Sequence, residues 1–380
     1  MTVFNTLIDQ EETVALLQQA IRAAQDGADE SQDMTHAWLF TGPPGSGRSN
    51  AALAFAASLV CAGGGCGSCV DCRTTLSGSH VDVELVQTES LSIKIDEIRE
   101  LMTRAAWRPS VANYRVVVIK DADRLTESAA NALLKAIEEP SSRTIWLLCA
   151  PTVSDVLPTI RSRTRNLILR TPSAPAVSRL LQSEGISANL ANFAAAASQG
   201  HIGRARYLAR DQVARDIRSD ILKLPTTVVD VASAFVAAAQ LVSAAKTQAE
   251  SDAEKKNEAE LVALKEAWGQ QGSKLVAGGS KAVKDREKEQ KSRQTRMIRD
   301  YLDRALLDIA TLYRDILLTQ MGDTHEKINT DLIDVIKKLA SSSTPQQTLA
   351  KIEIILKTRA NLLLNAAPLL VIEAMMVQLR

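Results

Sequence analysis

The amino-acid sequence, 380 residues long, predicts an α/β domain with a parallel sheet, followed by a small helical domain and a larger all-α domain. Three observations support this fold class. An apolar run at residues 38–41 passes through a glycine-rich loop into an alanine-rich helical pattern. Further apolar, β-branched runs alternate with helical patterns, as they do in doubly wound sheets. From residue 171 onward the hydrophobic period is that of helices.

The loop at residues 42–49 has the sequence Gly-Pro-Pro-Gly-Ser-Gly-Arg-Ser. This pattern before a helix is typical of phosphate-binding loops, in which backbone N–H groups and a helix N-terminus face an anion. Arg48 stands where lysine is expected, and a planar guanidinium is a poor substitute for a compact ammonium group. We therefore expect a degenerate nucleotide site that binds ATP weakly or not at all. The expected site residues are Gly42, Gly45, Ser46, Gly47, Arg48, Ser49 and, from a later strand, Asp121.

The remaining elements of the first domain follow from the hydrophobic pattern. A helical pattern across residues 14–21 leads into the first strand. Further strands are expected at residues 81–86, 114–119 and 144–150, with helices at residues 93–105 and 126–138. The run at 114–119 ends in Lys-Asp-Ala-Asp, so that strand carries an acidic tip that includes Asp121.

Four of the five cysteines lie within residues 61–72. Thiolates spaced C-x4-C-x2-C-x2-C can close a tetrahedron around Zn²⁺ and leave no open position for catalysis. We therefore expect a structural zinc module in a reducing compartment. The alternatives are reduced thiols on a flexible loop, or His80 in place of one ligand. The expected ligands are Cys61, Cys66, Cys69 and Cys72.

Composition excludes two classes of protein. The formal net charge of +1 lacks the strongly basic footprint of a nucleic-acid binder that acts alone. No apolar run approaches the ~20 residues of a membrane span, and residues 1–30 are acidic rather than signal-like. We expect a cytoplasmic protein without a membrane partner.

Domain boundaries follow from shifts in composition. Thr-Pro-Ser-Ala-Pro at residues 171–175 is a plausible hinge, and Pro225 closes a short helical stretch. We therefore expect domains at residues 1–170, 171–225 and 226–380. Within the last, residues 245–296 alternate lysine, glutamate and alanine, which favours an inserted, solvated helical hairpin over a DNA-binding arm. Its glycine interruptions are Gly269, Gly272, Gly278 and Gly279.

Three further motifs agree in order as well as in type. They are Ile-Asp-Glu-Ile-Arg-Glu-Leu at residues 95–101, Asn-Ala-Leu-Leu-Lys-Ala-Ile-Glu-Glu-Pro at 131–140 and Thr-Ile-Arg-Ser-Arg at 159–163. With the glycine loop and the cysteines, they make residues 36–165 resemble the delta prime subunit family of the bacterial DNA polymerase III clamp loader, in the AAA+ superfamily. The resemblance implies an ATPase-like domain, a helical lid and a C-terminal collar. Through the collar, five subunits, including gamma/tau and delta, would form a ring.

Departures from the family pattern predict which kind of subunit this is. An active ATPase of this family would carry Asp-Glu at the acidic tip, where the glutamate positions the attacking water; here Ala122 follows Asp121. The family's sensor threonine falls on Ala150, and its lid arginine falls on Gly203. The resemblance therefore implies a subunit that is not an enzyme by itself but belongs to the polymerase holoenzyme, at the nucleoid-associated replisome.

Arg163 is retained, and the resemblance implies that it acts as an arginine finger in trans on a neighbour's ATP while the ring loads the sliding clamp onto primed DNA. Without the resemblance, a surface salt bridge would explain Arg163, and Arg161 is the alternative finger. Lys135 and Arg99 would face DNA, a neighbouring subunit or solvent. Two other functions remain open. They are an active gamma/tau-like motor in which Asp123 replaces the missing glutamate, and a zinc-ribbon nucleic-acid protein.

Overall fold

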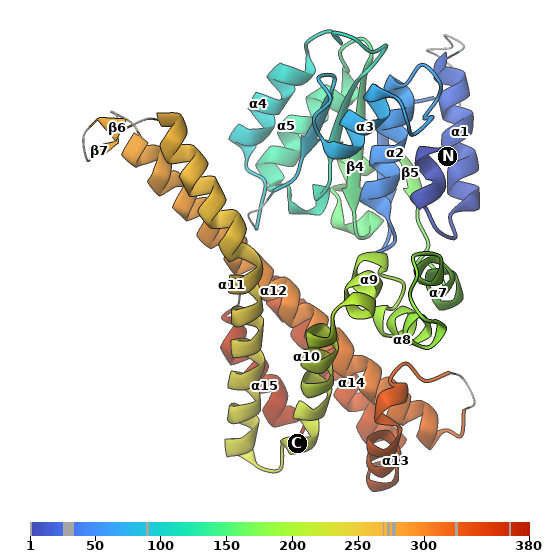
Figure 1. Ribbon diagram of the computed structural model, residues 1–380, viewed down its shortest axis with the longest axis vertical. Helices are drawn as coiled ribbons and strands as arrows, with labels where there is room; N and C mark the ends of the chain where they lie inside the picture. The colour runs from blue at the N-terminus through green and yellow to red at the C-terminus, as the bar shows by residue number, and fades with distance from the viewer. Residues whose placement is uncertain are drawn as a thin grey trace. The chain divides into compact units, whose positions relative to one another are not determined.

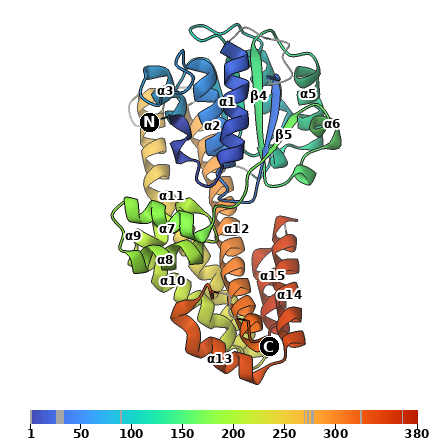
Figure 2. The same ribbon diagram turned by 90° about the vertical axis from the view of Figure 1, so that its right-hand side faces the viewer.

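The computed structural model describes residues 2–25, 34–88, 91–268, 270–271, 274–275, 279–323, 326–364 and 366–380. The chain divides into two compact units, Met1–Ala209 and Arg210–Arg380 (Figures 1 and 2). The first unit contains residues 171–209 of the expected lid, and the second contains residues 210–225. The division into three domains stays a prediction. In the described part of the chain, no helix combines the length and apolar character needed to span a membrane.

A five-stranded sheet in the order β2-β3-β4-β1-β5 forms the centre of the first unit, and every neighbouring pair is parallel. The strands are β1 (Ala37–Thr41), β2 (Val83–Val86), β3 (Arg115–Ile119), β4 (Thr144–Ala150) and β5 (Arg165–Ile168). The predicted parallel sheet is confirmed. The start of β2 was predicted two residues too early, because Val81 is exposed in a turn and the Asp82 carboxylate binds another loop. β5 was not predicted.

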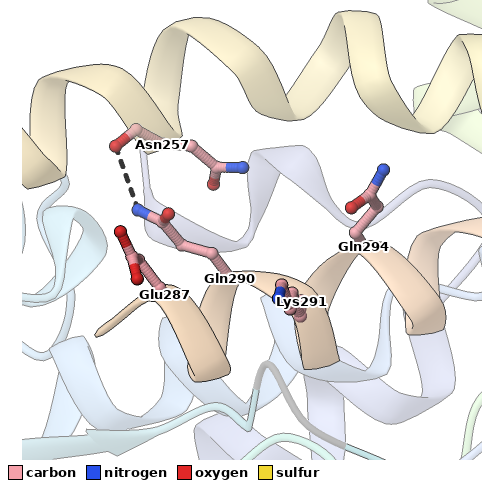
Figure 3. A pocket seen from close by; sticks show the side chains of 5 residues that line it. All are labelled: Asn257, Glu287, Gln290, Lys291 and Gln294. Atoms are coloured by element: carbon pink, nitrogen blue, oxygen red, sulfur yellow. Dashed lines mark hydrogen bonds between the residues drawn. The ribbon is translucent and has the colours of Figure 1, made fainter. Parts of the chain in front are cut away.

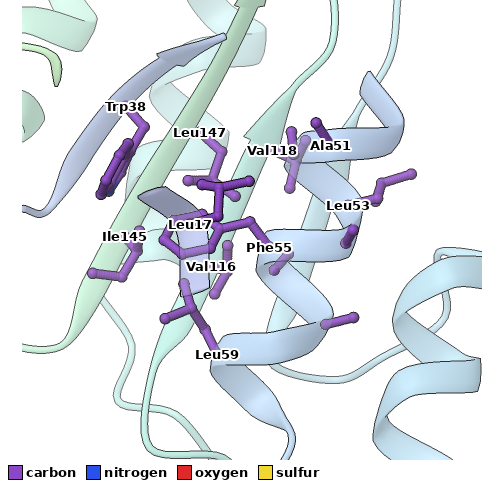
Figure 4. Packing of buried hydrophobic residues seen from close by; sticks show 14 of the residues in the cluster. Leu17, Trp38, Ala51, Leu53, Phe55, Leu59, Val116, Val118, Ile145 and Leu147 are labelled. Atoms are coloured by element: carbon purple, nitrogen blue, oxygen red, sulfur yellow. The ribbon is translucent and has the colours of Figure 1, made fainter. Parts of the chain in front are cut away.

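Successive side chains along each strand point to opposite faces of the sheet, and helices cover both faces. This explains why the strand sequences are continuously apolar. One face packs against α1 (Glu11–Gln25) and α2 (Arg48–Val60); Figure 4 shows Leu17 and Phe55 of these helices among side chains of β1, β3 and β4. The other face packs against α4 (Ile95–Ala105) and α5 (Glu127–Glu138). The helices predicted at residues 93–105 and 126–138 are confirmed within two residues.

The short helices of the first unit are α3 (Val70–Ser77) and α6 (Pro158–Arg161), followed by α7 (Ala174–Ser183), α8 (Ala188–Ser198) and α9 (Ile202–Arg210). Pro158 begins α6, where its missing N–H costs no helical hydrogen bond. The strand β5 follows α6 directly. Residues 161–163, between the end of α6 and the edge strand, are exposed, whereas Ile160 is buried.

The second unit is helical, as predicted. Its helices are α10 (Gln212–Lys223), α11 (Val231–Trp268), α12 (Gly279–Gln320), α13 (Ile333–Ser342), α14 (Pro345–Leu363) and α15 (Pro368–Gln378). They share one apolar core, to which α12 contributes Leu302, Leu306 and Ile309. Arg218 of α10 forms a buried ion pair with Asp308 of α12, Nε to Oδ1 at 3.2 Å, and this ion pair fixes α10 within the unit.

The charged stretch at residues 245–296 forms two paired helical segments, as the predicted hairpin requires, and its description as an insertion stays a prediction. The stretch is the outer half of two continuous helices, α11 and α12, whose seam changes from apolar to polar along their length. Arg293 forms an ion pair with Glu260, and Gln290 donates to the Asn257 carbonyl at 2.9 Å across a polar groove (Figure 3). The alternating charges in the sequence coincide with the polar part of the seam, and both helices continue beyond it into the apolar part. The predicted interruptions at Gly269, Gly272 and Gly278 lie outside the described residues.

Candidate functional site

The glycine loop follows β1 at the carboxyl edge of the sheet, where parallel α/β proteins bind ligands. The loops after β3 and β4 end at the same edge, and the Gly42 N–H donates to the Pro151 carbonyl at 3.1 Å. Gly47, with φ of 88°, precedes the first residue of α2. That left-handed conformation is open to glycine but costly for other residues. The structure therefore contains the strand, loop and helix that the sequence predicts.

Polar groups of this loop bind the chain itself. The Ser46 N–H donates to the Pro43 carbonyl at 3.0 Å, and Nη1 of Arg48 donates to the Gly42 carbonyl at 2.8 Å. An extended lysine would direct its ammonium toward phosphate oxygens, whereas this guanidinium is turned back onto the loop that it belongs to. The Arg48 side chain is thus engaged where a phosphate ligand is needed.

His201, just before α9, packs against the glycine loop. A Cβ atom built on Gly45 would lie 2.5 Å from the Cα of His201, so no side chain larger than glycine fits there. The His201 ring accepts the Arg204 N–H on Nδ1 at 3.2 Å, which fixes the start of α9 above the loop. Sequence reasoning missed His201, because no local pattern links residues so far apart in the chain. The contact leaves little room for a nucleotide at Gly45.

The acidic tip after β3 has lost one carboxylate. Ala122 is buried where the family's catalytic glutamate is expected, and Asp121 and Asp123 flank it. Burial raises the pKa of the Asp123 carboxyl, and the charge of Asp121 raises it further. Oδ1 of Asp123 is buried and has no hydrogen-bond partner within the described residues. Burial therefore favours the protonated form of Asp123.

The four predicted cysteines face one another. Their Sγ atoms all lie within 4.8 Å, with Cys61 to Cys66 at 3.8 Å and Cys61 to Cys69 at 3.6 Å. A tetrahedral Zn²⁺ site with Zn–S distances of about 2.3 Å requires sulfur separations of about 3.8 Å. The two shorter separations match this value, and small side-chain rotations would bring all four thiols to a zinc ion.

Backbone donors support the thiolate form of this cluster. The N–H groups of Gly67, Cys69 and Cys72 each donate to a cysteine sulfur at 3.4 Å. The Ser68 and Cys69 N–H groups lower the pKa of the Cys66 thiol to about 6, whereas burial raises the pKa of Cys72. Thiolates are the form that binds metal, so the donors around Cys66 favour a metal ligand there.

His80 does not join the four thiols. Its Nδ1 accepts the Asp82 N–H at 3.0 Å, and its Nε2 lies 3.6 Å from the carboxylate of Asp71 on α3. Both ring nitrogens are therefore occupied by contacts that connect α3 to β2. The ligand set that the geometry supports is the all-cysteine one.

Arg163 lies on the surface just after α6, where three groups hold it. Its Nε forms an ion pair with Oε1 of Glu138 on α5 at 2.6 Å. Its Nη1 donates to the Thr159 carbonyl and to Ser162 Oγ, each at 3.1 Å. The side chain remains 43% exposed, so a molecule at this surface can reach the guanidinium.

The other predicted surface residues are also exposed. Arg161 lies in α6, and Lys135 lies on α5. Arg99 on α4 forms an exposed ion pair with Asp96 at 3.4 Å, which agrees with the solvated alternative. Nothing in these contacts assigns any of the three a ligand.

Comparisons with known proteins agree with these observations. A family described as DNA polymerase III, delta subunit, matches residues 10–173. Residues 10–173 are therefore similar to this family. The subunit delta' of Bacillus subtilis DNA polymerase III is 33% identical over 198 residues, which are 51% of this chain and 60% of that protein. The subunit delta' of Pseudomonas aeruginosa is 37% identical over 134 residues, which are 34% of this chain and 41% of that one.

The chain is also similar to a gamma/tau subunit. The gamma/tau subunit of Mycobacterium tuberculosis DNA polymerase III is 34% identical over 193 residues, 48% of this chain and 32% of that protein. The chain thus spans 60% or less of the length of each of these three relatives. The resemblance predicted from residues 36–165 is confirmed, and the parallel sheet with its glycine loop agrees with the predicted AAA+ fold.

Proposed function

We propose that this chain is a non-catalytic, delta prime-like subunit of a DNA polymerase III clamp loader that lends Arg163 to the ATP site of a neighbouring subunit. One contrast supports the proposal. Arg48 is turned back onto Gly42 and Ala122 carries no carboxylate, whereas Arg163 is held at the surface with part of its guanidinium exposed. A chain with an eroded nucleotide site has no use of its own for a phosphate-binding arginine.

The proposed partners follow from the relatives of this chain. Because these relatives are delta' and gamma/tau subunits of DNA polymerase III, we propose a five-subunit ring with gamma/tau and delta. In this ring the chain would help to load the sliding clamp onto primed DNA, in the cytoplasm at the nucleoid-associated replisome. The helical second unit would supply the collar.

Each part of the chain has a distinct chemical role in this proposal. The Arg163 guanidinium would pair with phosphate oxygens as charge develops during transfer. Cys61, Cys66, Cys69 and Cys72 would hold a structural Zn²⁺, which ties the glycine-rich segment after α2 where apolar packing is sparse. The glycine loop would bind ATP weakly or not at all.

The test is Arg163→Ala in the assembled complex. We expect the ring to form and hydrolysis at the one affected site to fall on the order of 10³-fold, because an arginine finger stabilises the transition state by that amount. The other sites will dilute the loss in bulk ATPase, so clamp loading is measured as well. Arg161→Ala is the matched control. An intact Arg163→Ala ring that loads clamps at the wild-type rate would refute the assignment.

A second candidate function is an active, gamma/tau-like ATPase. The half-buried Asp123 carboxylate with its raised pKa and the match to gamma/tau favour it. The two functions differ in the turnover of the isolated chain. We expect turnover at background level, because Arg48 and His201 occupy the loop. Turnover that Ser49→Ala abolishes would support the motor instead.

A further inference from the structure

The contacts of Arg163 leave one part of its guanidinium unused. An arginine has five N–H donors, one on Nε and two on each terminal nitrogen. Here Nε forms an ion pair with Glu138, and Nη1 donates to the Thr159 carbonyl and to Ser162 Oγ. Nη2 makes no hydrogen bond with any residue that the structure describes. Two donors on one nitrogen therefore remain for an external anion.

Glu138 differs from the other two contacts. Thr159 and Ser162 belong to the same short segment as Arg163, whereas Glu138 lies at the last residue of α5, on a separate element. Its side chain is 44% exposed, and an ion pair this exposed adds little to stability. The pair therefore has little value for the fold, but it does restrict the orientation of a long, flexible side chain.

We propose that Glu138 is a positioning residue for the Arg163 finger. Its carboxylate holds Nε and so orders the guanidinium with Nη2 free, before any phosphate arrives. Arginine gains more from such ordering than lysine does, because its donors lie in one rigid plane. An ordered donor needs no reorganisation when charge develops on the phosphate. This inference rests on the proposed function of Arg163 in trans.

The experiment is a double-mutant cycle in the assembled complex, with Glu138→Gln, Arg163→Ala and the double variant. Glutamine retains an acceptor but removes the charge. We expect Glu138→Gln to lower kcat about threefold to tenfold at unchanged KM, because the finger acts on the transition state. In the Arg163→Ala background, Glu138→Gln should have no further effect, because the two residues act as one unit. Glu139→Gln, the exposed neighbour, is the matched control and should leave kcat unchanged.

Each outcome decides one of the two proposals. If Arg163→Ala has no effect on an intact ring, the proposed function fails. If Arg163→Ala lowers the rate and Glu138→Gln does not, only the positioning role fails. A rate that rises in Glu138→Gln overturns it as well, since Glu138 would then restrain the finger. An equal loss in both backgrounds would indicate a structural role, and thermal melting of each variant checks for this.

Discussion

The helix α2 has a glycine-rich loop at each end, and the two loops use their polar groups in opposite ways. At the amino end, Arg48 binds the Gly42 carbonyl and His201 packs over Gly45. At the carboxyl end, the Sγ atoms of four cysteines lie within 4.8 Å of one another, and backbone N–H groups point at the sulfurs. The polar groups of the first loop are used within the protein, whereas the second loop brings together four thiols that can bind one metal ion.

This difference shows that a sequence motif can keep its structural role without keeping the ligand that the motif usually binds. The glycine pattern persists because its backbone shapes the turn from β1 into α2, with or without a nucleotide. Four thiols this close have no comparable role in shaping the backbone, and without a metal they would crowd partly charged sulfurs together. The motif at the amino end therefore indicates a fold element, and the motif at the carboxyl end has the geometry of a metal site.

The largest effect that would sharpen this contrast is expected at the zinc module. In Cys72→Ser, zinc should fall from about one ion per chain to well under half, because a tetrahedral site loses one of its four thiolates. Metal content of protein purified without chelator is the measurement. The variant should also melt earlier, because metal affinity is part of the folding free energy of such loops.

The matched control is Cys149→Ser, since Cys149 is a buried cysteine of β4 outside the cluster. It should retain a full complement of zinc even if its own burial makes the substitution destabilising. Wild-type protein with well under one zinc per chain would remove the contrast between the two ends of α2.

Much of this architecture was predictable because it is local. The strands, the glycine loop and the cysteine spacing are patterns over a few residues, and the predicted cysteines are those that meet. β5 was missed because Arg165–Ile168 is a four-residue edge strand with two polar residues, too short for a periodic signal. The helical hairpin at residues 245–296 was predictable from its alternating charges, but the full lengths of α11 and α12 were not.

The contacts that define the candidate sites could not be predicted in the same way. His201 contacts Gly45 although most of the sequence of the first unit lies between them. Glu138 contacts Arg163 only because α5 and α6 pack together. Such pairs depend on how elements pack, and a single sequence carries no periodicity that records it. Residue types were therefore predictable, but their partners were not.

A smaller effect is expected next to the zinc module, at Asp82. This fully buried carboxylate accepts the N–H groups of Ser110, Val111 and Ala112 at 2.6 to 2.8 Å. Burial opposes its charge, yet these three donors hold the pKa of Asp82 below the ordinary value. Asp82→Asn should therefore cost about 3 kcal/mol in free energy of unfolding at pH 7.

The pH dependence of this loss follows from the lowered pKa. A carboxylate with a lowered folded-state pKa stabilises the fold fully above the unfolded pKa of about 4 and ceases to do so as the pH falls through the folded value. The difference between wild type and Asp82→Asn should thus be constant from pH 7 to pH 5 and shrink below pH 4 in denaturant titrations. Asp96→Asn, an exposed carboxylate, should change stability by less than about 0.5 kcal/mol. A difference that grows on acidification contradicts the assignment.

The smallest effect is expected from restoring the usual lysine at the amino end of α2. If Arg48 alone disabled the loop, Arg48→Lys would recover tight ATP binding. We expect instead that nucleotide affinity changes by less than about tenfold, or 1.4 kcal/mol. One obstacle to binding remains in that variant, because His201 still lies against Gly45. Binding of a fluorescent ATP analogue to wild type, Arg48→Lys and Arg48→Ala measures this directly. Micromolar binding by Arg48→Lys alone would show that the loop retains its phosphate site and that the two ends of α2 differ by one side chain.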